Sequence, residues 1–160
     1  MTTALHLTLL ACSKKKTPHA APAAQLYSAS PLFRASLDYA LSRSPGVTFV
    51  LSAKHGLVDL DETIEPYDMT IRDIGGRAAR RAWGEHVVHE LARRIDVVPG
   101  SIEVLAGLAY EQHVHAPLVR LAKRDRDPWP RPTYPLAGLT IGPRIAALRA
   151  ALRDGGGLPC

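Results

Sequence analysis

The stretch VTFVLSA, residues 47–53, has the character of a buried β-strand because it is short, rich in β-branched and apolar residues, and preceded by a turn-forming Pro-Gly pair. Two other stretches, LHLTLLA at residues 5–11 and SIEVLAG at residues 101–107, share this character. Helical patterns separate the three. Parallel strands need long crossover connections, which helices usually fill, so this alternation predicts an α/β fold with a mostly parallel sheet and helices on both faces.

Four helices are predicted between and after these strands. The first begins with Ser30 as its N-cap and Pro31 at its first position. The others are expected at residues 76–94, at residues 109–123 and from Pro143 to a run of glycines.

The proline-rich segment at residues 124–135 is expected to be irregular and to lie on the surface, followed by a short fourth strand at residues 136–141. With 160 residues, the chain is expected to form one Rossmann-like domain of about four strands, residues 1–160.

Composition limits the class of protein further. With 46% hydrophobic and 22% charged residues, the chain is typical of a soluble globular protein and not of a disordered or membrane-spanning one. No secretory signal is expected, and Cys12 and Cys160 predict no disulfide, so we expect a cytoplasmic protein. The formal charge of +5 favours a polyanionic partner, either a nucleotide or a nucleic acid. The pattern predicts no cofactor and does not predict an oligomeric state.

In parallel sheets, ligands bind beyond the carboxyl ends of the strands, so the loops after the three strands are the candidate sites. The first loop, ACSKKK, has Cys12, Ser13, Lys14 and Lys16, which together suit a phosphate group. The alternative is that Cys12 is a small buried hydrophobe and that the lysines form a solvated turn.

The second loop places Lys54, His55 and Gly56 directly after Ser52, the last residue that can still belong to its strand. Lysine and histidine together offer a fixed cation and a group that titrates near neutral pH, which suits anion binding and proton transfer. The alternative is that His55 caps the turn and Lys54 is solvated.

Further along the same loop, IEPYD holds Tyr67 and Asp68 beside a proline. A carboxylate and a phenol on a rigid turn can activate water or stabilise positive charge that develops on a sugar ring. After the third strand, Tyr110 is a candidate for stacking on a base. His113 and His115 differ by two residues and therefore point apart on a helix, so no metal site is predicted.

Four arginines follow this turn: Arg72, Arg77, Arg80 and Arg81. They either contact successive phosphates of a nucleic acid or form a solvated helix face. Arg80 and Arg81 are expected on the exposed side of the helix at residues 76–94.

Five motifs in order, ACSKKK, AQLYSASPLF, VLSAKHGLV, IEPYD and YPLAGLTIGPRIAAL, resemble a bacterial and phage-borne family of small uncharacterised proteins. That family looks distantly similar to the YaaA peroxide-stress proteins and, more generally, to Rossmann-like nucleosidases and uracil-DNA-glycosylase-type folds. The resemblance implies a site with two walls. One is formed by residues 12, 13, 14 and 16, the other by Ser52, Lys54, His55 and Gly56, with Tyr67 and Asp68 completing it and with Tyr27 and Phe33 packing or contacting the ligand.

Two main functions remain open from these residues, beside a third possibility in which Cys12 is a reactive or redox thiol. The first is an enzyme, a hydrolase or transferase, that cleaves or exchanges an N-glycosidic bond, with Asp68 stabilising the transition state and His55 or Lys54 assisting the leaving base. The alternative is a non-catalytic DNA-binding stress-response protein, as the likeness to YaaA suggests.

Overall fold

The computed structural model describes residues 3–159 as one α/β domain built on a five-stranded sheet. The strand order is β4-β3-β1-β6-β7, with β1 (His6–Ala11) at the centre, flanked by β3 (Gly46–Ser52) and β6 (Ser101–Leu105). Both pair with β1 in parallel, and β7 (Pro132–Thr133) extends the parallel part on one side. The expected fold class is confirmed.

One edge strand is antiparallel. After Ser52, a three-residue turn leads into β4 (Gly56–Asp59), which pairs back against β3 with Ser52 opposite Gly56. Gly56 adopts a φ of 72°, a left-handed conformation that glycine takes without a steric cost. The stretch after the second predicted strand is therefore the turn of a β-hairpin and its returning strand.

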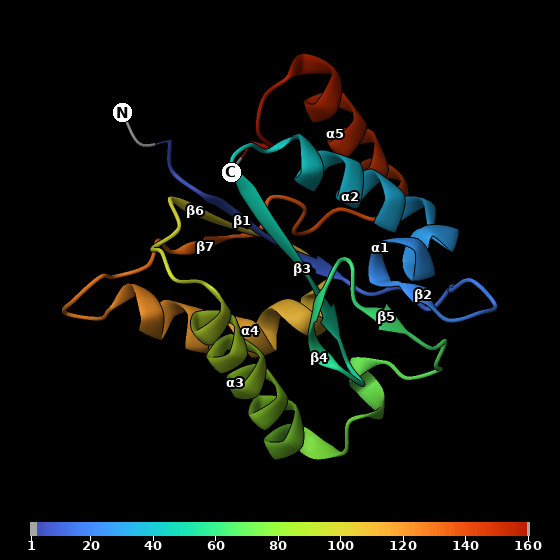
Figure 1. Cartoon of the computed structure of the whole chain (residues 1–160), viewed down its shortest axis with the longest axis horizontal. Coiled ribbons are helices and arrows are strands. Elements are labelled where there is room, and N and C mark those ends of the chain that lie inside the picture. Colours follow the sequence, from blue (N-terminus) through green and yellow to red (C-terminus); the bar gives the residue numbers. More distant parts are fainter. Residues whose placement is uncertain (1–2, 160) are drawn as a thin grey trace.

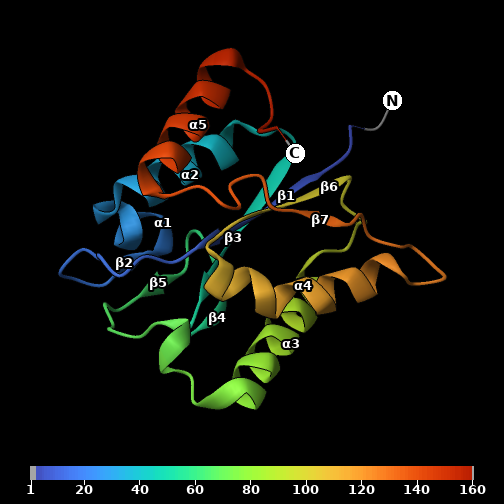
Figure 2. The ribbon, with the colours of Figure 1, turned by 180° about the vertical axis from the view of Figure 1, so that it is seen from behind.

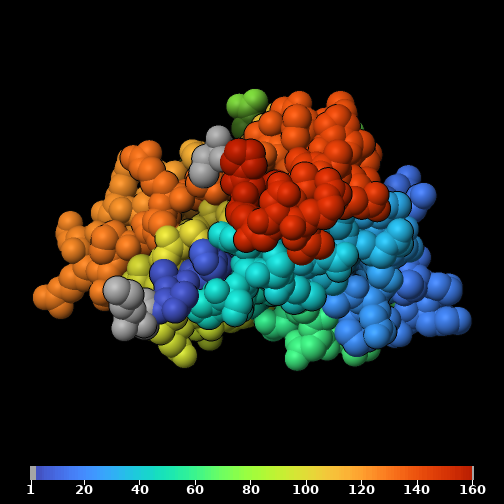
Figure 3. Space-filling view, turned by 90° about the horizontal axis from the view of Figure 1, so that it is seen from above, coloured from blue at the N-terminus to red at the C-terminus, as the bar shows by residue number. Residues whose placement is uncertain are grey.

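Helices cover both faces of the sheet (Figures 1 and 2). On one face, α2 (Pro31–Ser42) packs against α5 (Ile141–Asp154), and Figure 3 shows these two helices spread over that side of the molecule. On the other face, α3 (Gly76–Arg94) packs against α4 (Leu108–Ala122). The predicted cap of α2 is confirmed, because the Ser30 hydroxyl accepts a hydrogen bond of 3.2 Å from the Phe33 N–H.

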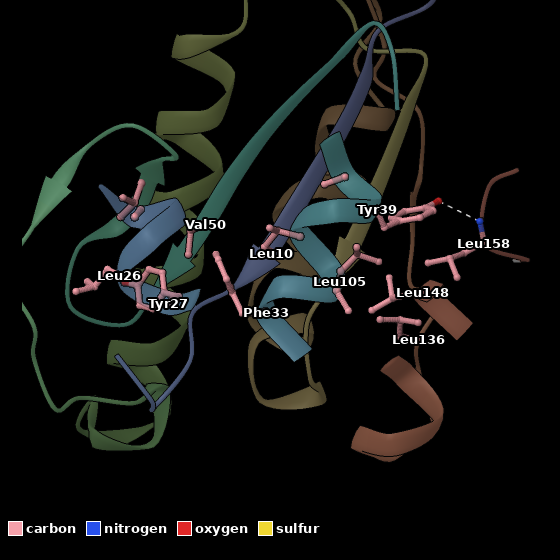
Figure 4. Close-up of a cluster of buried hydrophobic side chains, with 14 of the residues drawn as sticks. Leu10, Leu26, Tyr27, Phe33, Tyr39, Val50, Leu105, Leu136, Leu148 and Leu158 are labelled. Atoms are coloured by element: carbon pink, nitrogen blue, oxygen red, sulfur yellow. Dashed lines mark hydrogen bonds between the residues drawn. The ribbon is translucent and has the colours of Figure 1, made fainter. Parts of the chain in front are cut away.

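Strand alternation supplies both halves of the core. Leu10, Val50 and Leu105 occupy paired positions in the three central strands and point toward α2 and α5 (Figure 4). Their neighbours Leu9 and Val104 point to the opposite face and pack with α3 and α4. Continuous apolar strands of this kind are what a sheet buried on both faces requires.

Smaller elements complete the fold between the main ones. They are β2 (Ala21–Pro22), which pairs antiparallel with β5 (Thr63–Ile64), the one-turn helix α1 (Ala23–Leu26), and two 3₁₀ turns at Tyr27–Ala29 and Ile71–Asp73.

The predicted strand at residues 136–141 is wrong. Residues 134–139 form successive turns, in which Gly138 has a φ of 78°, and α5 already begins at Ile141, two residues before the expected Pro143. Proline is tolerated within the first helical turn because its missing N–H would have no intrahelical partner there. The last strand of the sheet instead falls within the proline-rich segment, where Pro132 pairs with Ile102 of β6.

Candidate functional site

The strand order opens a crevice at the carboxyl ends of β1 and β6. From β1 the chain passes to β3 on one side and later returns across β1 to β6 on the other. The loops leaving β1 and β6 therefore turn away from each other, which is the point where ligands bind in open α/β sheets. Two cavities lie here, and both are lined by Cys12 and Ser13 directly after β1.

The first, called here the cationic cavity, has a volume of about 260 Å³. Its charged lining consists of three cations, Lys14, Lys16 and Arg72, and one carboxylate, Asp68. In the described part of the chain, none of these four forms an ion pair within 4.0 Å. An unbalanced positive lining attracts anions, so this cavity suits a phosphate or carboxylate ligand.

The lysine turn after β1 is held by its own hydrogen bonds. The Ser13 hydroxyl donates to the Lys15 carbonyl at 2.6 Å, and the Lys16 ammonium donates to the Lys14 carbonyl at 3.3 Å. As a result Lys14 and Lys15 are exposed, whereas Lys16 is half-buried. Ser13 thus shapes the turn as well as lining both cavities.

Lys16 sits in a partly desolvated place. Its ammonium lies 4.2 Å from the centroid of the Tyr67 ring, within the range of a cation–π contact. Burial lowers the pKa of Lys16, an effect that Cys12 and Asp68 partly oppose. A lysine with a lowered pKa is a better proton donor near neutral pH than an ordinary one.

The second cavity, called here the apolar cavity, has a volume of about 170 Å³ and lies between the ends of β1 and β6 and helix α2. Its walls include Leu32, Phe33 and Leu136, and its polar groups include Ser36 and Arg144. The Arg144 guanidinium donates to the Ala106 carbonyl at 2.9 Å and to the Leu139 carbonyl at 2.7 Å, which fixes its position. The cavity combines apolar walls with a few fixed polar groups, as small-molecule sites do.

A hydroxyl cluster of Tyr27, Ser52 and Tyr67 lies beside the lysine turn. The Tyr67 hydroxyl is 2.7 Å from both the Tyr27 and the Ser52 hydroxyls, and Ser52 also accepts a hydrogen bond of 3.0 Å from the His55 N–H. Burial raises the pKa of Tyr27 to about 12 and raises that of Tyr67 further. All three groups therefore stay protonated at neutral pH and hold the turn after β3 in place.

Tyr110 contributes from helix α4. Its hydroxyl lies 3.1 Å from the Cys12 sulfur, and burial, followed by the effect of Cys12, raises the pKa of Tyr110. Its ring makes an edge contact with Trp83 at 5.7 Å, and the Trp83 indole donates to the Ser52 carbonyl at 3.0 Å. The three central strand ends are thereby linked through side chains.

Lys54, His55 and Gly56 lie apart from both cavities in the described structure. The Lys54 ammonium is 5.7 Å from the Tyr67 ring centroid, and the His55 ring meets Tyr67 edge-on at 5.2 Å. Burial and Lys54 lower the pKa of His55, so its imidazole is neutral at pH 7. Gly56 faces His86 of α3, whose ring carbon would be 3.5 Å from an added Cβ.

The structure divides the four arginines of the helix α3 region. Arg72 lines the cationic cavity, and Arg77 and Arg81 are exposed. Arg80 was expected on the exposed side, but it is half-buried and donates to the carbonyls of Ile74 and Arg72, each at 3.0 Å. The reason is that the carbonyls of residues 72 and 74, just before α3, lie within hydrogen-bonding reach of the Arg80 side chain.

Sequence reasoning missed Arg144 and Ser36 at the apolar cavity. Ser36 lies in α2 and Arg144 in α5, and although Arg144 falls within the motif YPLAGLTIGPRIAAL, no spacing or turn signal marks either residue as part of a site. Within residues 3–159, no group of three or more His, Cys, Asp or Glu side chains is arranged to hold a metal ion. None of the described helices is both long and apolar enough to span a membrane.

The sheet topology defines a Rossmann-like α/β protein with two cavities at the switch point between β1 and β6. Residues 7–150 match the model of DUF6884, a family of unknown function, and the chain belongs to that family. No curated protein and no solved structure matches the chain.

Proposed function

We propose that this protein is an enzyme that binds a nucleotide at the switch point and cleaves or exchanges its N-glycosidic bond. The observation that carries the proposal is the lining of the cationic cavity, where Asp68 faces the same space as Lys14, Lys16 and Arg72. Cations hold a phosphate, and an isolated carboxylate beside them suits the positive charge that develops on the sugar ring when the bond to the base breaks.

The apolar cavity supports the assignment of a base subsite. It adjoins the cationic cavity through Cys12 and Ser13, so a single ligand can extend from one into the other. Its apolar walls suit a planar ring, and Ser36 and the fixed Arg144 guanidinium suit the polar edge of that ring.

In the hydrolytic form of the reaction, the oxygen of water forms a bond to the anomeric carbon while the bond from that carbon to the base nitrogen breaks. Asp68 accepts the proton of the attacking water and stabilises the oxocarbenium-like transition state. The leaving base takes up a proton, for which Lys16 of the adjoining cationic cavity is the candidate donor because burial lowers its pKa. Assistance to the leaving base by His55 or Lys54 remains a prediction. It requires a substrate that extends as far as Tyr67, beside which both side chains lie.

The test is release of free base from a panel of nucleotides and nucleosides, followed by chromatography. Asp68→Asn should lower the rate by about 100-fold or more while nucleotide affinity stays within a few-fold, because the carboxylate acts mainly in the transition state. Asp61→Asn, which changes an exposed carboxylate in the preceding loop, is the matched control. Equal rates for wild type and Asp68→Asn would refute the assignment, as would nucleotide binding without turnover of any panel member.

A non-catalytic nucleic-acid-binding protein, the alternative that the sequence motifs suggest, is the second candidate. The exposed Lys14, Lys15, Arg77 and Arg81 favour it, because they lie on the surface where a polymer backbone could pass. Affinity for long DNA that falls steeply with salt, together with no affinity for free nucleotides, would support this candidate over the enzyme.

A further inference from the structure

A third cavity of about 230 Å³ continues the cationic cavity along helix α4. The two share Ile71, Arg72 and Ala109 in their linings, so they are neighbouring parts of one trough. The new part is called here the arginine cavity, and its polar lining consists of Arg72, Arg80, Gln112 and His113.

The lining of the arginine cavity carries positive charge without a carboxylate among the described residues. Arg80 is held by its two hydrogen bonds to the carbonyls of Ile74 and Arg72, which use its Nε–H and one Nη2–H. A guanidinium has five N–H donors, so those left over are pre-oriented for an anion. Burial and the charge of Arg80 lower the pKa of His113, so its imidazole is a neutral hydrogen-bonding group at the same wall.

Arg72 connects the two cavities, because its side chain lines both. One guanidinium can hydrogen-bond to two anionic groups at once when these are adjacent, as the two phosphates of a diphosphate are. In a polynucleotide, a sugar separates successive phosphates, and a single guanidinium is less suited to bridge them. The position of Arg72 in both linings therefore favours a diphosphate over a polynucleotide backbone as the ligand.

We propose that the arginine cavity is a second phosphate subsite and that the ligand is a nucleotide bearing a diphosphate. One phosphate occupies the cationic cavity beside Lys14 and Lys16, and the next occupies the arginine cavity beside Arg80 and His113, with Arg72 between them. This inference rests on the proposed function in placing a nucleotide phosphate in the cationic cavity, and it narrows the substrate class.

The experiment compares inorganic pyrophosphate with inorganic phosphate by isothermal titration calorimetry on the full chain. Wild type should bind pyrophosphate about tenfold more tightly or better, because the second phosphate gains charge-assisted hydrogen bonds. Arg72→Gln should reduce this preference to about threefold or less, and Arg80→Gln should do the same. Arg81→Gln, an exposed neighbour on the same helix, should leave it unchanged.

Arg80 also supports the backbone at residues 72 and 74, so thermal melting must accompany its variant. Arg72→Gln keeps the test decisive, since the Arg72 side chain is exposed and its replacement removes no buried packing. Equal affinities of wild type for phosphate and pyrophosphate would overturn the proposal. So would a tenfold preference retained by both the Arg72 and the Arg80 variants.

A 5′-phosphorylated dinucleotide, in which a sugar separates the phosphates, is the third probe. If it binds more tightly than pyrophosphate and loses this advantage in Arg72→Gln, the trough follows a polynucleotide backbone and the diphosphate assignment is wrong. None of these titrations requires base release. A protein that prefers pyrophosphate but releases no base would therefore contradict the proposed function and leave the second subsite standing.

Discussion

The close approach of helices α3 and α4 gives a prediction that depends on one glycine. Gly84 of α3 lies against the backbone of α4, and a Cβ added there would come within 1.9 Å of the His113 carbonyl oxygen and 2.7 Å of its carbonyl carbon. Ordinary contacts of a Cβ begin at 3.4 Å. We therefore expect Gly84→Ala to force the helices apart, since both atoms belong to the backbone and cannot rotate away.

The size of the effect follows from two opposing contributions. Overpacking at a backbone contact costs about 3 kcal/mol, and alanine in place of glycine within a helix returns about 1 kcal/mol. The net loss is about 2 kcal/mol in the free energy of unfolding, which lowers Tm by about 4–8 °C in a domain of this size. Because His113 lines the arginine cavity, the same displacement should weaken pyrophosphate binding.

Urea denaturation and thermal melting of the variant measure this loss directly. Gly156→Ala is the control, because Gly156 is exposed and an added Cβ there meets nothing within 4 Å. It should leave stability unchanged or raise it by up to about 1 kcal/mol. If Gly84→Ala proves as stable as Gly156→Ala, α3 and α4 do not pack at this distance and the reasoning fails.

Two further predictions concern polar contacts that stabilise the fold. Tyr39→Phe should lower the free energy of unfolding, measured by urea denaturation, by about 1–3 kcal/mol. The Tyr39 hydroxyl donates to Glu103 at 2.7 Å and accepts a hydrogen bond from the buried Leu158 N–H at 3.0 Å, the second of which is drawn in Figure 4. A loss below about 0.5 kcal/mol would contradict this prediction. Asp73→Asn should lower Tm at pH 7, because hydrogen bonds from the Thr70 N–H and hydroxyl hold the pKa of Asp73 below its ordinary value of 3.8. The stability that the charged Asp73 contributes is fully present above its ordinary pKa and is lost as the pH falls through its lowered, folded-state pKa. The difference in Tm between Asp73→Asn and wild type should therefore vanish in acid. An unchanged difference at about pH 2 would show that the charge of Asp73 does not cause it.

Local signals were sufficient for the main helices and strands. The predicted helix at residues 76–94 coincides with α3, and Ser30 with Pro31 marks the start of α2, because caps and hydrophobic spacing act within one or two turns. The three core strands lie within two residues of their predicted ends. The return strand β4 was missed, although Gly56, four residues after the end of β3, is a hairpin signal.

Part of the candidate site also follows from local reasoning. Cys12, Lys16, Asp68 and Tyr110 were singled out because they follow strands or a rigid turn, and the structure brings all four to the cationic cavity. Lys54 and His55 also follow a strand, but they lie apart from the cationic cavity because β3 is not at the switch point.

Sequence alone therefore determined the fold class and the polar loops, because hydrophobic spacing, caps and turn residues act between near neighbours. Only the tertiary structure decided which loops meet. The order of strands around β1, the pairing of β7 with β6 and the arrival of Arg144 and Arg80 at the cavities all depend on contacts between distant segments. Such contacts are selected by the packing of the whole domain, for which no single segment of the chain carries a signal.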